Sequence, residues 1–375
     1  MTEPVGVGVV GCGVISRTYL NTLLGLPQVR VVAIADRDDT RAKAVAKEHG
    51  VSAATVDELL ARPEVGIVLN LTTPSAHAEV ALRAIAHSKA VHNEKPLAAT
   101  TKDAAEILTA AEQAGVTVTC APDTVLGTGI QTARKAIDDG AIGAPIAATA
   151  TLGVPGHERW HPNPDFYYLP GGGPLLDMGP YYITALVTML GPVAEVVGAS
   201  SRTRPERTIA SGARAAERIP VAVDTHVTGV LVHDSGVLST LVMSFDVAAT
   251  NAAPIEVHGT DGSLTAPDPN EFDGTTLIRR PGETVWSPVP VSAGYLDSAR
   301  GIGIVDIAAM DDGEPPRASG ALAYHVLDVM ESLLRSAQVR RAVSVSSTCT
   351  RPTPVPLSSP WHNRSASVSA ARGRS

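Results

Sequence analysis

The first third of the chain alternates short apolar runs with longer stretches in which apolar residues recur every three or four positions. The apolar runs have the length of buried strands, and they occupy residues 5–10, 31–35, 65–71, 90–93 and 116–120. The stretches between them have the period of amphipathic helices, and they occupy residues 14–24, 40–49, 57–62, 75–87 and 101–114. Strands that alternate with helices at this spacing form a parallel sheet covered on both faces. The pattern therefore predicts one doubly wound α/β domain over residues 1–122.

The pattern changes after residue 122. One helix is predicted at residues 129–139 and a last one at 321–337, and between them apolar and polar residues alternate in strand-length segments. These segments occupy residues 146–152, 193–202, 225–232, 237–245, 255–258 and 263–266. Short turns, such as those at 234–236 and 260–262, are typical of hairpins. We therefore expect an α+β domain with a mostly antiparallel sheet over residues 123–345, and a disordered tail rich in Ser, Pro and Arg over residues 346–375.

A glycine-rich turn follows the first apolar run. The frame Gly11-x-Gly13-x-x-Ser16 falls where the strand must turn into a helix, whereas the competing frame that starts at Gly6 falls inside the strand. Gly11 allows a tight turn, Gly13 lets a pyrophosphate approach the backbone, and the helix N-terminus faces the anion. Asp36 ends the next apolar run, where a carboxylate accepts hydrogen bonds from an adenosine ribose. This order of elements predicts a dinucleotide site; the alternative is a tight turn without a ligand.

Composition narrows the class of protein. The chain has 375 residues, of which 44% are hydrophobic and 18% charged, as in globular domains. Its net charge of −8 argues against nucleic acid as the main partner. No uncharged apolar stretch reaches about 18 residues and no basic region precedes the first apolar run, so we expect a cytoplasmic protein without a membrane span or a signal peptide. The three cysteines are too scattered for a disulfide framework or a zinc site, and His226, His233 and His258 lack metal-ligand spacing.

Glu94-Lys95-Pro96 follows the apolar run at residues 90–93, at the edge of the predicted sheet where ligands bind in open α/β folds. Pro96 disfavours helical geometry at Lys95 and so restricts where the lysine side chain points. An ammonium beside a bound nicotinamide can donate to a substrate oxygen, and burial can bring its pKa within range of proton transfer. The alternative is an ordinary surface lysine before a turn.

Aromatic residues are scarce in this chain but gather between residues 157 and 182. This segment contains His157, Trp160, His161, Phe166, Tyr167, Tyr168, Tyr181 and Tyr182. Asp177 and Tyr181 are four positions apart, so they share a face if the segment is helical there. Aromatic faces combined with hydroxyls and a carboxylate suit a sugar or polyol. The alternative is that these aromatics form the core of the second domain.

Together these motifs resemble one known family. Gly11-x-Gly13-x-x-Ser16, Thr73-Pro74 with His77, Glu94-Lys95-Pro96 and Gly172-Gly173-Pro174-x-x-Asp177-x-Gly179 follow one another in the order and spacing of the glucose-fructose oxidoreductase, inositol dehydrogenase and rhizopine catabolism (Gfo/Idh/MocA) family. The resemblance covers about residues 5–345. It implies a Rossmann domain, then an open, mostly antiparallel sheet that binds substrate and often builds a dimer or tetramer interface. It also implies reversible hydride transfer between NAD(P) and a carbon of a sugar, inositol or related alcohol.

Residue by residue, the resemblance places Lys95 on the family's catalytic lysine and Asp177 on the carboxylate of its second motif. The family usually has a histidine at the position of Tyr181, and this sequence has Thr184 where a further aspartate is common. A tyrosine is a weak base at neutral pH because its free pKa is about 10, unless Lys95 lowers it. We expect Lys95, Tyr181 and Asp177 to be the catalytic residues. Alternatively, Lys95 or His161 handles the proton and Tyr181 only positions the sugar.

Cofactor and substrate contacts are expected on the same motifs. The expected cofactor-binding residues are Gly11, Gly13, Val14, Ile15, Asp36, Arg37, Thr72, Thr73, Pro74, His77, Glu94 and Lys95. The expected substrate-binding residues are His157, Trp160, His161 and Tyr168. Asp36 favours NAD because its charge repels a 2′-phosphate, whereas Arg37 beside it could accept that phosphate, so NADP is the alternative cofactor.

The main hypothesis is an NAD(P)-dependent oxidoreductase acting on a sugar, inositol or related polyol, and we expect a homodimer or homotetramer. In this hypothesis Lys95 polarises the reacting oxygen, Tyr181 relays its proton and Asp177 orients the substrate. One alternative is a non-catalytic dinucleotide-binding sensor or assembly protein, which the missing family histidine motivates. Another is a glycosidase that uses transient oxidation of the sugar by NAD to cleave a glycosidic bond.

Overall fold

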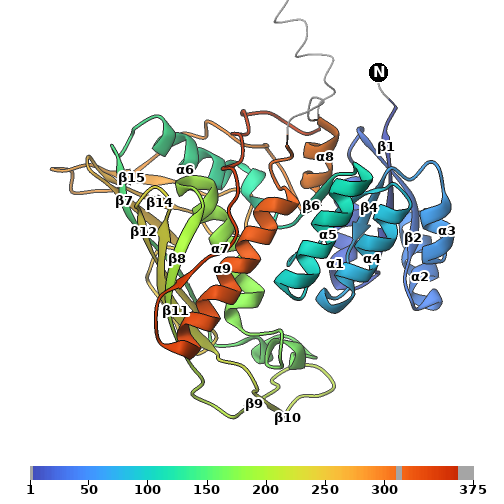
Figure 1. The fold of residues 1–375 in the computed structure, drawn as a ribbon, viewed down its shortest axis with the longest axis horizontal. Coiled ribbons are helices and arrows are strands. Elements are labelled where there is room, and N and C mark those ends of the chain that lie inside the picture. The colour runs from blue at the N-terminus through green and yellow to red at the C-terminus, as the bar shows by residue number, and fades with distance from the viewer. Residues whose placement is uncertain (1–2, 310–314, 362–375) are drawn as a thin grey trace, which may run out of the picture. The chain divides into compact units, whose positions relative to one another are not determined.

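The structure is a computed structural model that describes residues 3–309 and 315–361 (Figure 1). The chain forms two compact units, each discontinuous in sequence. The N-terminal unit consists of Met1–Thr128, Ala293–Tyr324 and Pro352–Ser375. The second, which we call the sheet unit, consists of Gly129–Ser292 and His325–Arg351. No helix among the described residues is long and apolar enough to cross a membrane.

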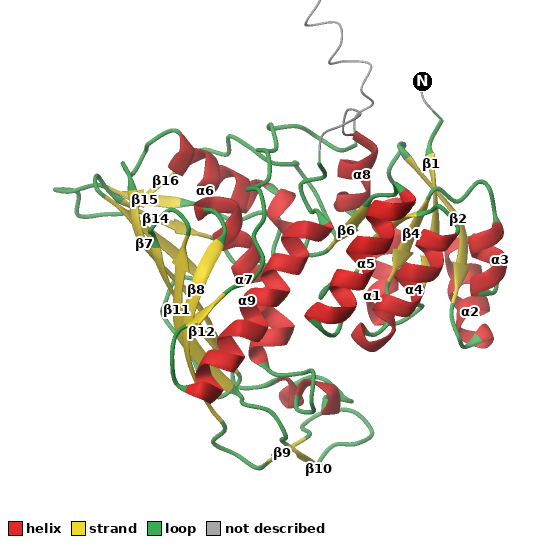
Figure 2. Cartoon of the chain, in the orientation of Figure 1, coloured by secondary structure: helices red, strands yellow, loops and turns green. Residues whose placement is uncertain are grey.

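The N-terminal unit is built on a six-stranded parallel sheet with the order β3-β2-β1-β4-β5-β6. Its strands are β1 (Val5–Val10), β2 (Val29–Ala35), β3 (Ser52–Ala53), β4 (Ile67–Asn70), β5 (Ala90–Asn93) and β6 (Val118–Cys120). Its helices are α1 (Val14–Leu23), α2 (Asp39–His49), α3 (Val56–Ala61), α4 (Pro74–Ala86), α5 (Thr101–Ala114), a short 3-10 helix (Thr124–Leu126) and α8 (Ile302–Ala309) (Figure 2). The predicted doubly wound fold is confirmed. Its strand order changes direction between β1 and β4, and ligands bind at such a point in open α/β sheets.

Local sequence signals explain where the helices of this unit begin and end. The side chain of Asp38 accepts hydrogen bonds from the first-turn backbone of α2, and Thr55 forms a capping box with Glu58 at the start of α3. Gly50 and Gly115 adopt left-handed geometry directly after α2 and α5, a conformation that glycine reaches at little cost. These signals set the lengths of the helices, and with them the loops that connect each helix to its neighbouring strands.

The sheet unit contains a nine-stranded sheet with the order β16-β15-β14-β13-β7-β12-β11-β8-β17. Its strands are β7 (Pro145–Gly153), β8 (Val193–Ser201), β11 (His226–His233), β12 (Leu238–Ser244), β13 (Ile255–Gly259), β14 (Ser263–Ala266), β15 (Leu277–Arg279), β16 (Ser287–Pro288) and β17 (Val343–Ser344). Among the described strands of this sheet, only β7 and β12 pair in parallel, so the expected mostly antiparallel sheet is confirmed. A separate ribbon pairs β9 (Glu206–Thr208) with β10 (Arg218–Pro220).

Helices pack on this sheet through small residues and long apolar faces. The unit contains α6 (Thr128–Asp138), α7 (Pro174–Leu190) and the part of α9 (Gly320–Val339) from His325 onward. Nearly all of α7 after its first turn is buried, and the helix contacts β7, β11 and β12. Leu333 of α9 lies over Gly198 and Gly229, where an added Cβ would come within 3 Å of it. The glycines on β8 and β11 therefore let α9 approach the sheet closely.

The chain is divided differently from the sequence-based expectation. The first segment of the N-terminal unit ends at Thr128 rather than at residue 122. Residues 293–324 and 352–361, which the sequence placed in the second domain and the tail, also belong to the N-terminal unit. The prediction that residues 346–361 are disordered is wrong. The carboxylate of Asp328 accepts hydrogen bonds from Ser346 and Ser347, and Val355 is 1% exposed. These contacts hold the Ser- and Pro-rich segment 346–361 in a defined position. Residues 362–375 of the predicted tail lie outside the described residues.

Candidate active site

The glycine turn between β1 and α1 has the geometry that the sequence predicted. Gly11 has φ +103°, and an added Cβ would lie 2.6 Å from the backbone carbon of Leu71, so only glycine fits. Gly13 caps α1 without a side-chain hydrogen bond, and nothing lies within 4 Å of the position of its Cβ. Ser16 is fully buried, and its hydroxyl donates to the carbonyl of Gly13 at 2.7 Å. The turn therefore leaves an open, uncapped helix N-terminus that can receive an anion.

Asp36 lies beside this turn at the end of β2. Its Oδ2 accepts a hydrogen bond from the backbone N–H of Cys12 at 2.7 Å, and its Oδ1 accepts one from Asp38 N–H at 2.9 Å. Arg41 Nη1 lies 3.8 Å from Asp36 Oδ2, and Arg37 is exposed. Burial and the nearby Asp36 charge raise the pKa of the Cys12 thiol to about 11. The structure thus brings the glycine turn and the acidic residue together, as predicted.

His77 joins the loops that follow β4 and β5. Its Nδ1 lies 2.7 Å from the carbonyl oxygen of Pro96, and its Nε2 lies 3.1 Å from that of Thr72. The side chain is fully buried, and burial lowers its pKa. Both ring nitrogens are therefore occupied by backbone. His77 holds the Thr72-Thr73-Pro74 and Glu94-Lys95-Pro96 loops together, so its placement does not support the predicted direct contact with a cofactor.

Lys95 lies at the carboxyl end of β5, on the same sheet edge as the glycine turn. The preceding Glu94 is 8% exposed, and its carboxylate accepts hydrogen bonds from the Tyr19 hydroxyl at 2.9 Å and from Lys95 N–H at 2.7 Å. Asn70 and Asn93 pair across the ends of β4 and β5 at 3.0 Å, and Thr72 Oγ1 donates to Asn70. Glu94 therefore fixes the backbone of Lys95. The half-buried ammonium of Lys95 is the group here that can donate to a substrate oxygen.

The sheet unit brings His157 and Asp177 together. His157 belongs to a short 3-10 helix (His157–Arg159), and its Nε2 lies 3.0 Å from Oδ2 of Asp177. Asp177 is in the first turn of α7, one turn before Tyr181, which is 4% exposed. The His157 ring contacts that of Tyr167, with 4.4 Å between ring centroids. The sequence predicted His157, Asp177 and Tyr181 in the site, but not the pairing of the histidine with the carboxylate.

The remaining aromatic residues of this segment divide into two groups. Trp160 is 60% exposed and Phe166 is 56% exposed, and the half-buried His161 lies between them, with ring centroids 5.3 Å and 5.5 Å away. Tyr168, in contrast, is fully buried, and its hydroxyl hydrogen-bonds Glu158. The first group remains available for a substrate. The placement of Tyr168 does not support its predicted substrate contact, because the ring is enclosed and the hydroxyl already has partners.

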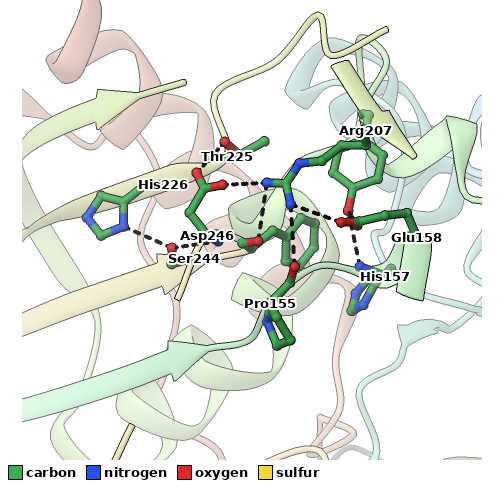
Figure 3. Close-up of polar contacts among 10 residues, drawn as sticks. Pro155, His157, Glu158, Arg207, Thr225, His226, Ser244 and Asp246 are labelled. Atoms are coloured by element: carbon green, nitrogen blue, oxygen red, sulfur yellow. Dashed lines mark hydrogen bonds and ion pairs between the residues drawn. The ribbon is translucent and has the colours of Figure 1, made fainter. Parts of the chain in front are cut away.

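A buried ion network lies under this segment, and no sequence pattern predicted it (Figure 3). Arg207 on β9 donates to Glu158 at 3.0 Å, to the carbonyl of Phe245 at 3.3 Å and to Asp246. The Arg207 side chain is 1% exposed, and Asp246 also accepts from Thr225 Oγ1 at 2.6 Å. The network connects the loop after β7 with the end of β12. It was missed because Arg207 is 49 positions from Glu158.

The chemistry-bearing residues lie in both units. Lys95, the glycine turn and Asp36 belong to the N-terminal unit, whereas His157, Asp177 and Tyr181 belong to the sheet unit. Among the described residues, no group of three or more His, Cys, Asp or Glu side chains could hold a metal ion.

Comparison with known proteins places both units in one group. Residues 5–121 match the family model described as "Oxidoreductase family, NAD-binding Rossmann fold", and residues 130–265 match the GFO/IDH/MocA C-terminal domain. The chain is 32% identical to the 1,5-anhydro-D-fructose reductase of Ensifer adhaerens over 264 residues, 68% of this chain and 74% of that protein. It is 27% identical to a D-xylose 1-dehydrogenase (NADP(+)) of Haloferax volcanii, over 84% of this chain and 91% of that one.

A solved structure confirms the fold over nearly the whole chain. Levoglucosan dehydrogenase, in complex with NADH and L-sorbose, superposes with a TM-score of 0.78. The match covers 92% of this chain and all of that one, at 21% sequence identity. At this identity the likeness concerns the fold alone.

Proposed function

The chain belongs to the GFO/IDH/MocA family of NAD(P)-dependent oxidoreductases, and we propose that it transfers a hydride between nicotinamide and one carbon of a sugar, inositol or related polyol. The names of the two relatives above support this substrate class, since one is a reductase and the other a dehydrogenase of sugars. The exposed rings of Trp160 and Phe166 on either side of His161 also support it, because such faces stack on sugar rings.

The observation that carries the proposal is the glycine turn with its acidic neighbour. The open face at Gly13 and the uncapped start of α1 fit a pyrophosphate, and Gly11 permits the close turn. The Asp36 carboxylate, already oriented by two backbone N–H groups, has lone pairs left for ribose hydroxyls. We propose NAD as the preferred cofactor because Asp36 opposes a 2′-phosphate, with Arg37 and Arg41 as the groups that could accept one.

We assign a separate role toward the substrate to each of Lys95, Asp177 and Tyr181. Bound nicotinamide supplies or accepts the hydride. Lys95, whose backbone Glu94 fixes, donates to the reacting oxygen and stabilises its developing negative charge. Asp177 accepts a substrate hydroxyl, and Tyr181, one helical turn later, serves as proton carrier or as positioning group.

The test is absorbance at the reduced-nicotinamide band during incubation with NAD or NADP and a panel of sugars, inositols and sugar acids. Lys95→Met should lower kcat by at least about 100-fold, because a positioned proton donor is lost, while nucleotide affinity stays within about twofold. Lys102→Met, an exposed lysine on α5, is the matched control and should behave as wild type. Equal turnover in wild type and Lys95→Met would refute the assignment of Lys95.

Tyr181 in place of the usual histidine also motivates two other functions. A nucleotide-binding sensor or assembly protein would bind dinucleotide tightly and show no turnover across the panel. A glycosidase that oxidises the sugar transiently would release an aglycone from a glycoside without net reduction of the cofactor. We further expect a homodimer or homotetramer through the open sheet, which light scattering on the purified protein would test.

A further inference from the structure

The pair of His157 and Asp177 has the geometry of a histidine–carboxylate dyad. Their side chains are 13% and 17% exposed, and the Nε2–Oδ2 distance is 3.0 Å. A carboxylate only accepts hydrogen bonds, so the neutral imidazole must carry its proton on Nε2. Nδ1 is then the nitrogen with a lone pair, ready to accept a proton. A carboxylate that fixes one ring nitrogen and leaves the other as a base is the arrangement found in general acid–base sites.

The backbone around His157 is held more firmly than an ordinary loop. Its N–H donates to the hydroxyl of Tyr168 at 3.1 Å, and that hydroxyl donates to Glu158. Glu158 in turn accepts from the buried guanidinium of Arg207 at 3.0 Å (Figure 3). Because every member of this chain of contacts is nearly inaccessible to water, the position of the His157 backbone is set by the interior of the unit.

The ring of His157 is enclosed as well. Ring centroids of Tyr167 and Phe245 lie 4.4 Å away, and that of Trp160 lies 5.3 Å away. These neighbours come from the loop after β7 and from the end of β12, so they restrict the ring from two directions. A histidine whose backbone, ring plane and tautomer are all fixed is suited to proton exchange at one place.

We propose that His157 is the catalytic proton-exchanging residue of the reaction, with Asp177 as the residue that sets its tautomer and stabilises its imidazolium. The inference rests on the proposed oxidoreductase function and deepens it. Tyr181 then contacts and positions the substrate. Imidazoles titrate near pH 6.5 and phenols near pH 10, so histidine exchanges protons more readily at neutral pH.

The step is balanced in the oxidation direction. The O–H bond of the substrate hydroxyl breaks, and Nδ1 of His157 takes the proton. The C–H bond of the same carbon breaks, and its electron pair leaves as a hydride to the oxidised nicotinamide that the proposed function supplies. A C=O bond forms, and the imidazolium is paired with the Asp177 carboxylate until its proton is released to water. Reduction runs the same changes backwards.

The test compares wild type with His157→Ala, His157→Gln and His258→Ala. His157→Ala should lower kcat/KM by about 100-fold to 10,000-fold, and free imidazole should restore at least tenfold of this loss, because it supplies the missing base in the space left by the ring. His157→Gln should stay inactive, because an amide keeps a donor for Asp177 but is no base. His258→Ala, which removes a half-buried histidine bonded to Ser263, is the control and should turn over as wild type does.

A second measurement detects the hydrogen bond between His157 and Asp177 without any need for turnover. Nitrogen-15 spectra of the imidazoles should show the Nε2–H tautomer for His157 in the free wild-type protein, and Asp177→Ala should change it. Turnover of His157→Ala within threefold of wild type would overturn the proposal, and so would recovery in His157→Gln without imidazole, which would mean a structural role. Silence of the wild type across the whole panel would overturn the proposed function and the dyad with it. If the wild type turns over and only the His157 variants lose activity, both the oxidoreductase function and the dyad are supported. If the wild type and the His157 variants turn over equally, only the dyad is refuted.

Discussion

Removing the guanidinium of Arg207 should destabilise the sheet unit more than any surface ion pair. Its side chain is 1% exposed and donates to Glu158 at 3.0 Å, while its second nitrogen binds Asp246 and the carbonyl of Phe245. The two carboxylates are also largely buried, with 6% and 12% of their side chains exposed. Arg207→Met keeps most of the volume but leaves both carboxylates without their cation. Breaking a buried ion pair by removing one partner costs about 3–5 kcal/mol, and we expect a loss of this size in the free energy of unfolding.

The chain offers a matched control for this prediction. Arg214 also binds the segment after β7, through Asp165 at 2.6 Å, but its side chain is 32% exposed. Water replaces the lost contact there, so Arg214→Met should cost much less than Arg207→Met. Urea unfolding followed by circular dichroism measures both variants against wild type. Equal losses in the two variants, or a loss below about 1 kcal/mol in Arg207→Met, would contradict the reasoning, because either result means that burial does not decide the effect.

Three further predictions concern the N-terminal unit. Asp36→Asn should raise the ratio of kcat/KM with NADP to that with NAD by at least about tenfold, because the charge that opposes a 2′-phosphate is gone; an unchanged ratio would leave specificity with Arg37. The Cys12 pKa of about 11 predicts alkylation at pH 8 roughly 200-fold slower in the native protein than in urea, where the thiolate fraction is that of a free cysteine; mass spectrometry of labelled peptides measures both rates. Burial lowers the pKa of His92 to about 4, so the folded state stays neutral there while the unfolded chain takes up a proton near pH 6.5. The resulting stability is present above pH 6.5 and falls by up to about 3 kcal/mol as the pH drops to 4, and His92→Asn should flatten that part of the curve in urea titrations.

Much of the fold follows from local signals in the sequence. The buried runs of β1, β2, β4 and β5 and the helical period of α1, α2, α4 and α5 predicted the parallel sheet almost element by element. The return of residues 293–324 and 352–361 to the N-terminal unit could not be predicted in this way. Apart from α8 and the start of α9, those segments have no regular helical or strand period. Their places are decided by distant partners, such as Asp123, which accepts hydrogen bonds from Gly301 and Gly303 N–H groups at 2.7 Å and 3.1 Å.

The site shows the same division between local and distant contacts. The glycine turn with Asp36 was predictable because a strand, a turn and a helix must follow one another at fixed spacing. The pairing of His157 with Asp177 joins residues 20 positions apart across an irregular loop, and no period connects them. For Tyr168 the sequence suggested a role that the structure does not support. Its aromatic character suggested a sugar contact, but its ring is buried in the core and its hydroxyl binds buried Glu158.

The start of α7 explains how Asp177 can serve a neighbouring histidine. Gly173, at φ +95°, caps the helix without a side-chain hydrogen bond, so the first-turn N–H groups are not met by a cap, and the positive end of the helix dipole favours an anion at Asp177. Farther along, an added Cβ at Gly179 would lie 2.9 Å from the sulfur of Met330 on α9, so the helix is pressed against its neighbour between Asp177 and Tyr181. Packing therefore fixes the axis of α7, and the half-buried Asp177 in its first turn places Oδ2 3.0 Å from Nε2 of His157.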